Sequence, residues 1–142
     1  MESLARRIQV LEDREEIKEV VAKYSLHILS DETAKIPALF ADDGVFRIDS
    51  SALRIAGREA LTAFYKRMSP GTSFPVVHST TIVLEGDTAQ HIGVLDNPAH
   101  VEGRKGYLGI YHDQLRRVDG RRRFTERSFT FLRGEPRIST ST

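Results

Sequence analysis

The sequence predicts an α+β fold in which N-terminal helices pack on a strongly curved, mostly antiparallel sheet, a cone-shaped α+β barrel. Three observations lead to this prediction. Apolar residues recur at helical spacing near the N-terminus, whereas the chain from Pro75 onward reads as a series of long strands. Asp119-Gly120 separates the last two of these strands and is typical of a tight hairpin turn. Helices followed by antiparallel strands favour an α+β class over alternating βαβ units.

The helices are predicted from apolar stripes and from residues that start or stop helices. Asp13 and Glu16 form a capping-box pattern, which predicts that one helix ends before them and that a second begins. Ser30 or Asp31 is expected to cap the next helix, whose regular part is limited by Pro37. The helices are therefore expected over residues 3–12, 14–29, 36–40 and 58–68.

The strands are predicted from alternation and from the turns between them. Gly86-Asp87 and Asp119-Gly120 each join two strand-like segments, and the second pair fits a type I′ turn. One domain is expected over residues 1–135, followed by a C-terminal tail over 136–142. The strands are expected over residues 45–49, 52–55, 76–84, 88–95, 107–118 and 121–132.

The composition is ordinary for a soluble globular protein. Of the 142 residues, 39% are hydrophobic and 29% are charged, and the net charge is +1. This balance gives no reason to expect nucleic-acid binding. Cysteine is absent, which excludes disulfides and thiolate metal sites. No apolar run approaches the roughly 20 residues that cross a bilayer, and the charged N-terminus does not look like a signal peptide, so a cytoplasmic protein is expected.

Several segments, taken in order, resemble the nuclear transport factor 2-like superfamily and, within it, the SnoaL-like group. That group is similar to scytalone dehydratase and bile-acid 7α-dehydratase. The resemblance implies a cone-shaped interior that holds a small apolar molecule, although the superfamily hosts many activities and also non-catalytic domains. The segments that carry it are 14–24, 39–43, 57–61, His78, 86–89, 109–113 and Asp119-Gly120.

Two catalytic residues are implied by this resemblance. His78 stands at the start of an apolar strand, where dehydratase-like members place a histidine that acts as general base. A neutral imidazole with a pKa near 6.5 can accept a proton without a metal. Tyr24 matches the tyrosine that those enzymes aim into the cavity. The alternatives are a satisfied core histidine or an exposed strand-edge histidine at 78, and an ordinary core tyrosine at 24.

The sequence departs from the dehydratases at Leu29. Similar enzymes carry at this position an aspartate that orients the histidine, and leucine cannot accept a hydrogen bond. Asp31 could replace it only if the helix ends early and the chain turns inward. Asp113 is a second possible partner of His78. The arginine that the bile-acid enzyme uses late in its sheet also has no counterpart, because Phe131 stands there.

The remaining expectations concern the pocket and the charged hairpin. Alternation separates His112 from its neighbours on either side, and the face that carries Tyr111 and Asp113 is expected to line the cavity, with Gly109 leaving room. No spacing typical of a metal site occurs, so neither a metal nor a cofactor is expected. The arginines around Asp119-Gly120 are interpreted as a solvated hairpin end. Residues expected to contact substrate are Leu29, Phe46, Phe64, Tyr107 and Tyr111.

Two hypotheses for the function follow. The first is a cofactor-free lyase, such as a dehydratase, or an isomerase that acts by acid/base chemistry on an apolar, ring-bearing substrate. The alternative is a non-catalytic module of the same fold that binds a small ligand or supports oligomerisation, which Leu29 favours. In either case a homodimer or homotrimer is expected, with Leu4, Ile8 and Leu11 contributing to the contact, and neither nucleic acid nor membrane is an expected partner.

Overall fold

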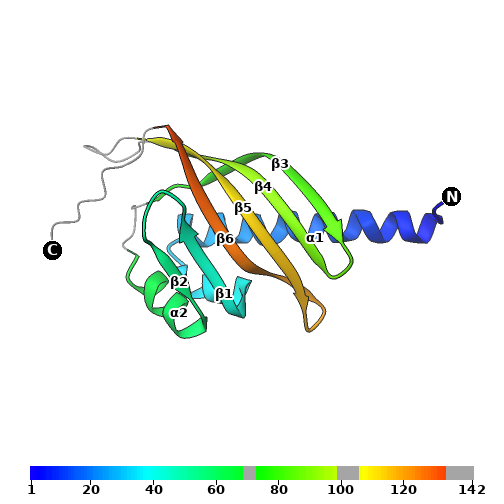
Figure 1. Ribbon diagram of the computed structural model, residues 1–142, viewed down its shortest axis with the longest axis horizontal. Helices are drawn as coiled ribbons and strands as arrows, with labels where there is room; N and C mark the ends of the chain where they lie inside the picture. Colours follow the sequence, from blue (N-terminus) through cyan, green and yellow to red (C-terminus); the bar gives the residue numbers. More distant parts are fainter. Residues whose placement is uncertain (69–72, 99–105, 134–142) are drawn as a thin grey trace.

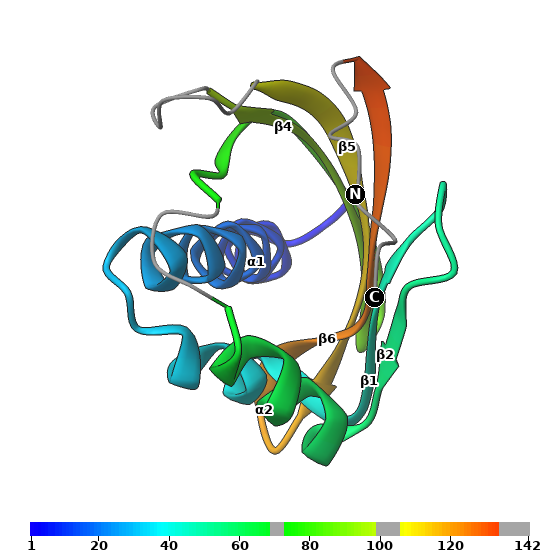
Figure 2. The same ribbon diagram turned by 90° about the vertical axis from the view of Figure 1, so that its left-hand side faces the viewer.

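The computed structural model describes residues 1–68, 73–98 and 106–133. Its six strands form one sheet in the order β2-β1-β6-β5-β4-β3, and this sheet curves around the helices (Figures 1 and 2). The elements, in chain order, are α1 (Leu4–Leu29), the 3₁₀ helix η1 (Thr33–Leu39), β1 (Phe40–Ile48), β2 (Arg54–Ala56), α2 (Arg58–Lys66), β3 (Val76–Glu85), β4 (Thr88–Asn97), β5 (Tyr107–Val118) and β6 (Arg121–Arg133).

The predicted fold class is confirmed. Neighbouring strands are antiparallel except β1 and β6, which pair in parallel and bring distant parts of the chain together. Helix α1 lies on the concave side of the sheet, and α2 lies near it at the β1 end (Figure 2). The predicted tail over 136–142 lies outside the described residues.

The N-terminal helix is longer than the sequence predicts. The expected break at Asp13 was wrong, because α1 runs without interruption from Leu4 to Leu29. The carboxylate of Asp13 does not cap a helix; it accepts hydrogen bonds from Gln9 and Arg117 and is buried against the sheet. Among the described helices, none is both long and apolar enough to span a membrane.

The first turns of α1 extend past the sheet (Figure 1). Leu4, Ile8 and Leu11 are spaced along this part of the helix and are all exposed. The homodimer or homotrimer to which these residues were expected to contribute stays a prediction.

The segment after α1 also differs in detail from the prediction. Phe40, expected to end a helix, begins β1 instead. The 3₁₀ helix before it contains Pro37 and is followed by a register shift in the pairing of β1 with β6 between Phe40 and Val45. Arg58 of α2 donates to the carbonyl oxygens of Pro37 and Phe40, which fixes this irregular stretch against the helix.

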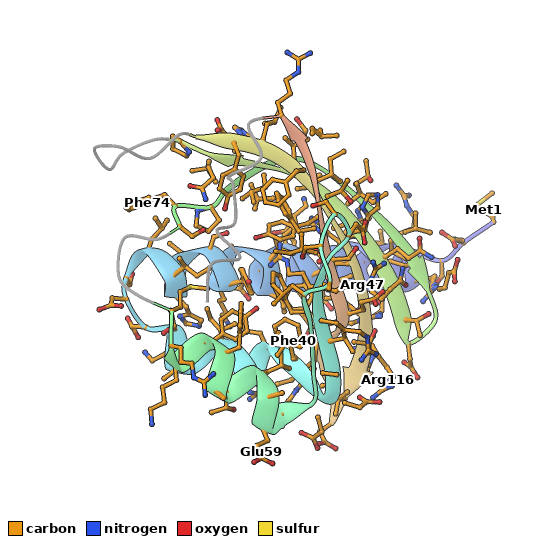
Figure 3. All side chains as sticks on the ribbon, turned by 60° about the vertical axis from the view of Figure 1, so that its left-hand side comes forward. Met1, Phe40, Arg47, Glu59, Phe74 and Arg116 are labelled. Carbon is orange, nitrogen blue, oxygen red and sulfur yellow. The ribbon has the colours of Figure 1, made fainter. Side chains whose placement is uncertain are left out.

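The hydrophobic core fills the space between the concave face of the sheet and the helices. Figure 3 shows Phe40 in this interior, whereas Glu59 of α2 points away from it. Tyr24 of α1 contacts aromatic rings from three directions, namely Phe40, Tyr111 and Phe124, at centroid distances of 6.2 to 6.5 Å. Edge-on contacts of this kind are favourable beyond the area that they bury.

The arginine-rich hairpin is only partly solvated, which corrects the sequence-based interpretation. Arg122 is 2% exposed, and its two terminal nitrogens donate to the carbonyl oxygens of Gly86 and Asp87 in the turn between β3 and β4. Together with Arg117 it also approaches Asp13 of α1. These arginines therefore join two hairpin ends to the long helix.

The β5–β6 hairpin confirms its predicted turn and its predicted inward face. Asp119 and Gly120 both have positive φ, as a type I′ turn requires. On β5, Tyr111 and Asp113 are buried whereas His112 is exposed. Gly109 leaves room on the same face: a Cβ there would lie 2.1 Å from Cζ of Phe129.

We expect Gly109→Ala to destabilise the protein by about 1–3 kcal/mol, because Phe129 would have to leave its position in a packed core. Chemical denaturation monitored by circular dichroism measures this loss. A double-mutant cycle with Phe129→Leu should show that the two changes cost less together than the sum of each alone, since the ring is the nearest obstacle, whereas the carbonyl oxygen of Thr130 at 2.6 Å remains. Equal stability of Gly109→Ala and the wild type would contradict the described packing.

Candidate active site

Three polar side chains meet on the concave face of the sheet, where apolar residues otherwise predominate. His91 of β4 is paired in register with Asp113 of β5, which in turn is paired with Arg127 of β6. Alternation turns all three toward the core, and each is buried. We call these residues the His–Asp–Arg cluster.

A short hydrogen bond joins the histidine to the carboxylate. Nδ1 of His91 lies 2.8 Å from Oδ2 of Asp113, and both side chains are 0% exposed. Because an ionised carboxylate only accepts hydrogen bonds, Nδ1 donates to Asp113, and Nε2 is an acceptor whenever the ring is neutral. Within the described part of the chain, no group is placed to hydrogen-bond Nε2. The arrangement orients a free basic nitrogen.

The arginine completes the charge balance of the cluster. Nε of Arg127 lies 3.3 Å from Oδ1 of Asp113, as an ion pair without directed hydrogen-bond geometry. The guanidinium carbon lies 3.5 Å from the ring centroid of Tyr111 and 4.2 Å from that of Tyr24. Burial alone would lower the pKa of Arg127, but Asp113 and the tyrosines raise it above its usual value. Arg127 therefore stays positively charged.

The terminal nitrogens of Arg127 are the least satisfied groups of the cluster. Neither Nη1 nor Nη2 has a hydrogen-bond partner among the described residues, although the side chain is 0% exposed. Buried donors in folded proteins normally have a partner. A buried cation with free N–H groups is suited to an oxygen atom that carries negative charge.

Tyrosine hydroxyls lie beside the cluster. Tyr24 and Tyr65 share a hydrogen bond of 2.8 Å between their oxygens. Burial raises the pKa of both phenols, and that of Tyr111, well above the usual value near 10. All three phenols therefore remain protonated at neutral pH and can donate a hydrogen bond.

A glycine makes room for the imidazole. A Cβ on Gly93 would lie 2.8 Å from Cε1 of His91 and 2.9 Å from Cγ1 of Val77 on β3. The same Cβ would lie 3.3 Å from Nε2. The edge of the ring that carries the free nitrogen thus lies over Gly93.

The structure does not place His78 in the interior. Its side chain is 55% exposed, and its Nε2 lies 4.0 Å from Asp96, which is also half-exposed. The expectation that His78 and Tyr24 face one pocket was wrong, because alternation on β3 turns this histidine to the outer face of the sheet. Asp113 was expected as a possible partner of His78, and it contacts His91 instead.

Two further candidates lie outside the cluster. Asp31 is exposed in the turn after α1, with φ at +56°, and does not turn inward. Leu29 is 47% exposed at the end of α1, and its expected contact with a substrate stays a prediction.

Of the other residues expected to contact a substrate, one lies beside the His–Asp–Arg cluster and three pack elsewhere against aromatic rings. Tyr111 packs directly on Arg127. Tyr107, the first residue of β5, packs against Phe131 at a centroid distance of 5.1 Å. Phe46 and Phe64 pack on each other between β1 and α2, at 5.7 Å. Substrate contact by these residues stays a prediction.

His91 and Arg127 are the site residues that the sequence analysis missed. The signal for His91 is its place between Ala89 and Gly93, in an alternating set of small and apolar residues that faces inward. Arg127 is harder to find, because the pairing of β6 with β5 shifts register before it. Phe131 does stand where an arginine was sought, yet the same strand carries a buried arginine four residues earlier.

The cluster does not have the composition of a metal site. Among the described residues, no three histidine, aspartate or glutamate side chains converge as metal ligands. The carboxylate of Asp113 is instead paired with the guanidinium of Arg127, and the two charges compensate each other.

The chain belongs to the family of SnoaL-like domains. The model of that family matches residues 9–128 and so includes most of α1, all or part of every strand and the whole His–Asp–Arg cluster. None of the curated proteins matches the sequence.

Solved structures show the same fold. An NTF2-like protein with a cystatin-like fold from Novosphingobium aromaticivorans is 26% identical, with 94% of this chain and 93% of that chain covered and a TM-score of 0.81. A variant of Rv3472, a protein of unknown function from Mycobacterium tuberculosis, is 23% identical, with coverage of 92% and 76% and a TM-score of 0.74. A protein from N. aromaticivorans that is provisionally named a scytalone dehydratase is 20% identical, with coverage of 87% and 86% and a TM-score of 0.73.

We expect Asp113→Asn to destabilise the protein by about 3–5 kcal/mol, because it removes the buried negative charge next to Arg127. Urea denaturation at neutral pH measures the effect. The matched control is Asp96→Asn, which breaks the exposed contact with His78 and should cost less than about 1 kcal/mol. Equal losses in the two variants would contradict a charged, buried cluster.

We expect stability to fall as pH rises above about 10. In the unfolded chain tyrosines ionise near pH 10, whereas Tyr24, Tyr65 and Tyr111 stay protonated in the fold, so stability is intact below that pH and decreases above it. Each tyrosine contributes about 1.4 kcal/mol per pH unit. Urea titrations between pH 9 and 11 should therefore show a shallower slope in Tyr111→Phe. An unchanged slope in that variant would contradict the prediction.

Proposed function

We propose that the protein is a cofactor-free enzyme that acts by acid/base chemistry, as a lyase of the dehydratase kind or as an isomerase. The observation that carries this proposal is the buried hydrogen bond of 2.8 Å between His91 and Asp113, which leaves Nε2 of the imidazole without a partner among the described residues. A neutral histidine oriented by a carboxylate is a common general base.

The roles within the site follow from the contacts. His91 accepts a proton on Nε2 and later returns it to the product or to a leaving hydroxyl group. Asp113 fixes the tautomer of the ring and stabilises the imidazolium while the proton is held. Asp113 is itself paired with Arg127, so the positive charge that forms on His91 is available to balance the negative charge that develops on the substrate.

The surroundings favour an apolar substrate that carries a ring. Aromatic side chains from α1, β5 and β6 line the region around Arg127, and they would pack on a flat apolar molecule. The SnoaL-like family and the resemblance to a protein provisionally named a scytalone dehydratase are consistent with this choice.

The second candidate function is a non-catalytic module that binds a small ligand. The observation that favours it is the complete burial of His91 and Asp113. A buried network of charged and polar side chains can have a purely structural role, in which it makes the packing of the core specific. The two candidates differ in one property. Only the enzyme removes a proton from carbon.

Exchange of carbon-bound protons with solvent tests the proposal without knowledge of the natural substrate. A panel of cyclic ketones in D₂O is followed by proton NMR for loss of the signals next to the carbonyl group. We expect the wild-type protein to catalyse exchange in at least one member of the panel, and His91→Gln to reduce the rate by about 10²–10⁴-fold, since it removes the base.

Two other histidines provide the controls. His112→Gln and His78→Gln change exposed imidazoles and should leave the exchange rate within about twofold of the wild type. Loss of exchange in His78→Gln with full activity in His91→Gln would contradict the assignment of the base. Absence of exchange with every ketone would favour the ligand-binding module.

A further inference from the structure

We propose that Arg127 and His91 together form a site for an oxygen anion, and that an anion binds there with uptake of one proton by His91. This inference rests on the proposed function and narrows its substrate class to ring-bearing carbonyl compounds whose oxygen gains negative charge during the reaction. It assigns to Arg127 direct contact with that oxygen.

Arg127 supplies N–H donors that have no acceptor. Nη1 and Nη2 of Arg127 are buried and have no acceptor among the described residues. The Tyr111 ring at 3.5 Å and the Tyr24 ring at 4.2 Å hold the guanidinium on two sides, which limits its freedom to move toward another partner. A planar, oriented guanidinium with free N–H groups matches a carboxylate or an enolate oxygen.

The charge of the His–Asp–Arg cluster also favours an anion that arrives with a proton. Arg127 is positive and Asp113 is negative, so with a neutral His91 the cluster carries no net charge. An anion that enters this buried region adds one negative charge, which is costly unless it is compensated. Protonation of Nε2 restores neutrality and also turns an acceptor into a donor toward the anion.

The other groups around the cluster do not offer a competing proton site at neutral pH. α1 contributes Tyr24, α2 contributes Tyr65, and β5 contributes Tyr111; burial raises the pKa of all three phenols, which are already protonated. β3 contributes the apolar Val77 beside Gly93. The carboxylate of Asp113 is held by contacts with both His91 and Arg127, so among the described residues here His91 is the group that we expect to take up a proton when an anion binds.

The same charge change occurs in the reaction. The C–H bond next to a carbonyl group breaks, its electron pair forms a C=C bond, and the carbonyl π pair moves to oxygen, which Arg127 receives. The proton goes to Nε2 of His91. In an elimination, the enolate then reforms the carbonyl group and expels a hydroxyl group, which leaves as water with the proton from His91. In an isomerisation, that proton returns to another carbon.

Benzoate and benzamide test the inference, because they share a ring and size but differ in charge. Isothermal titration calorimetry is performed in buffers with different heats of ionisation, at about one pH unit above the ordinary histidine pKa of about 6.5. We expect benzoate to bind at least about tenfold more tightly than benzamide, with uptake of about one proton. Benzamide should bind without proton uptake.

Variants separate the preference for benzoate from the uptake of a proton. Arg127→Leu should abolish the preference for benzoate, and His91→Gln should abolish the proton uptake. Arg121→Leu, an exposed change on the same strand, and His112→Gln should behave as the wild type. If thermal unfolding shows that Arg127→Leu does not fold, Arg127→Lys keeps the charge but loses the planar fork and should weaken benzoate binding about tenfold.

The binding and exchange experiments distinguish an absent anion site from an absent enzyme activity. No binding of benzoate, equal binding of benzoate and benzamide, or proton uptake that persists in His91→Gln would overturn the anion site. Ketone exchange that depends on His91 would still support the acid/base enzyme in that case. Proton-coupled binding of benzoate in a protein that exchanges no ketone would support the anion site and reject the enzyme.

Discussion

The carboxylate of Asp113 holds the candidate site together. One of its oxygens accepts the hydrogen bond of His91 and the other lies beside the guanidinium of Arg127, so a single buried anion orients a base and balances a cation. Without this carboxylate, Arg127 would be an unpaired buried charge, which is strongly unfavourable, and Nδ1 of His91 would lose its hydrogen-bond partner. The position of Asp113 at the centre of β5, between the strands that carry its partners, makes this sharing possible.

The sheet provides the precision that such a cluster needs. Direct register pairs join β4 to β5 and β5 to β6 at these residues, so the three side chains are set by backbone hydrogen bonds rather than by a loop. Two glycines on the same face leave room for large side chains. The imidazole of His91 packs over Gly93, and the ring of Phe129 packs over Gly109. The same strands therefore supply the curvature of the sheet around the site (Figure 2) and the glycines that accommodate its side chains.

The sequence was sufficient for the class of the fold and for most of its strands. β5 has the predicted bounds, and the turn at Asp119-Gly120 forms as expected, because alternation and turn chemistry are local signals. The break at Asp13 was predicted from a local capping pattern. In the structure the carboxylate of Asp13 accepts a hydrogen bond from Arg117, which lies far away in the sequence, and the helix continues through Asp13.

The site was harder to predict than the fold. Asp113 and Tyr111 were placed on the inward face correctly, since one period-two pattern fixed both. His78 was chosen by resemblance, and a shift in the pairing of β3 with β4 after this residue shows how easily the face of a strand is mistaken. Arg127 could not be found by composition, because an arginine is usually assigned to the surface and here the charge of Asp113 keeps it inside.

The parallel pairing of β1 with β6 has a consequence for the order of events during synthesis. Phe40 lies opposite Phe124 in the sheet, although more than half of the chain separates them. The ribosome must therefore release β6 before β1 acquires this neighbour, and until then the apolar face of α1 lacks its final cover. Assembly of this kind depends on contacts between distant segments, which makes folding slow and leaves the nascent chain dependent on protection from aggregation.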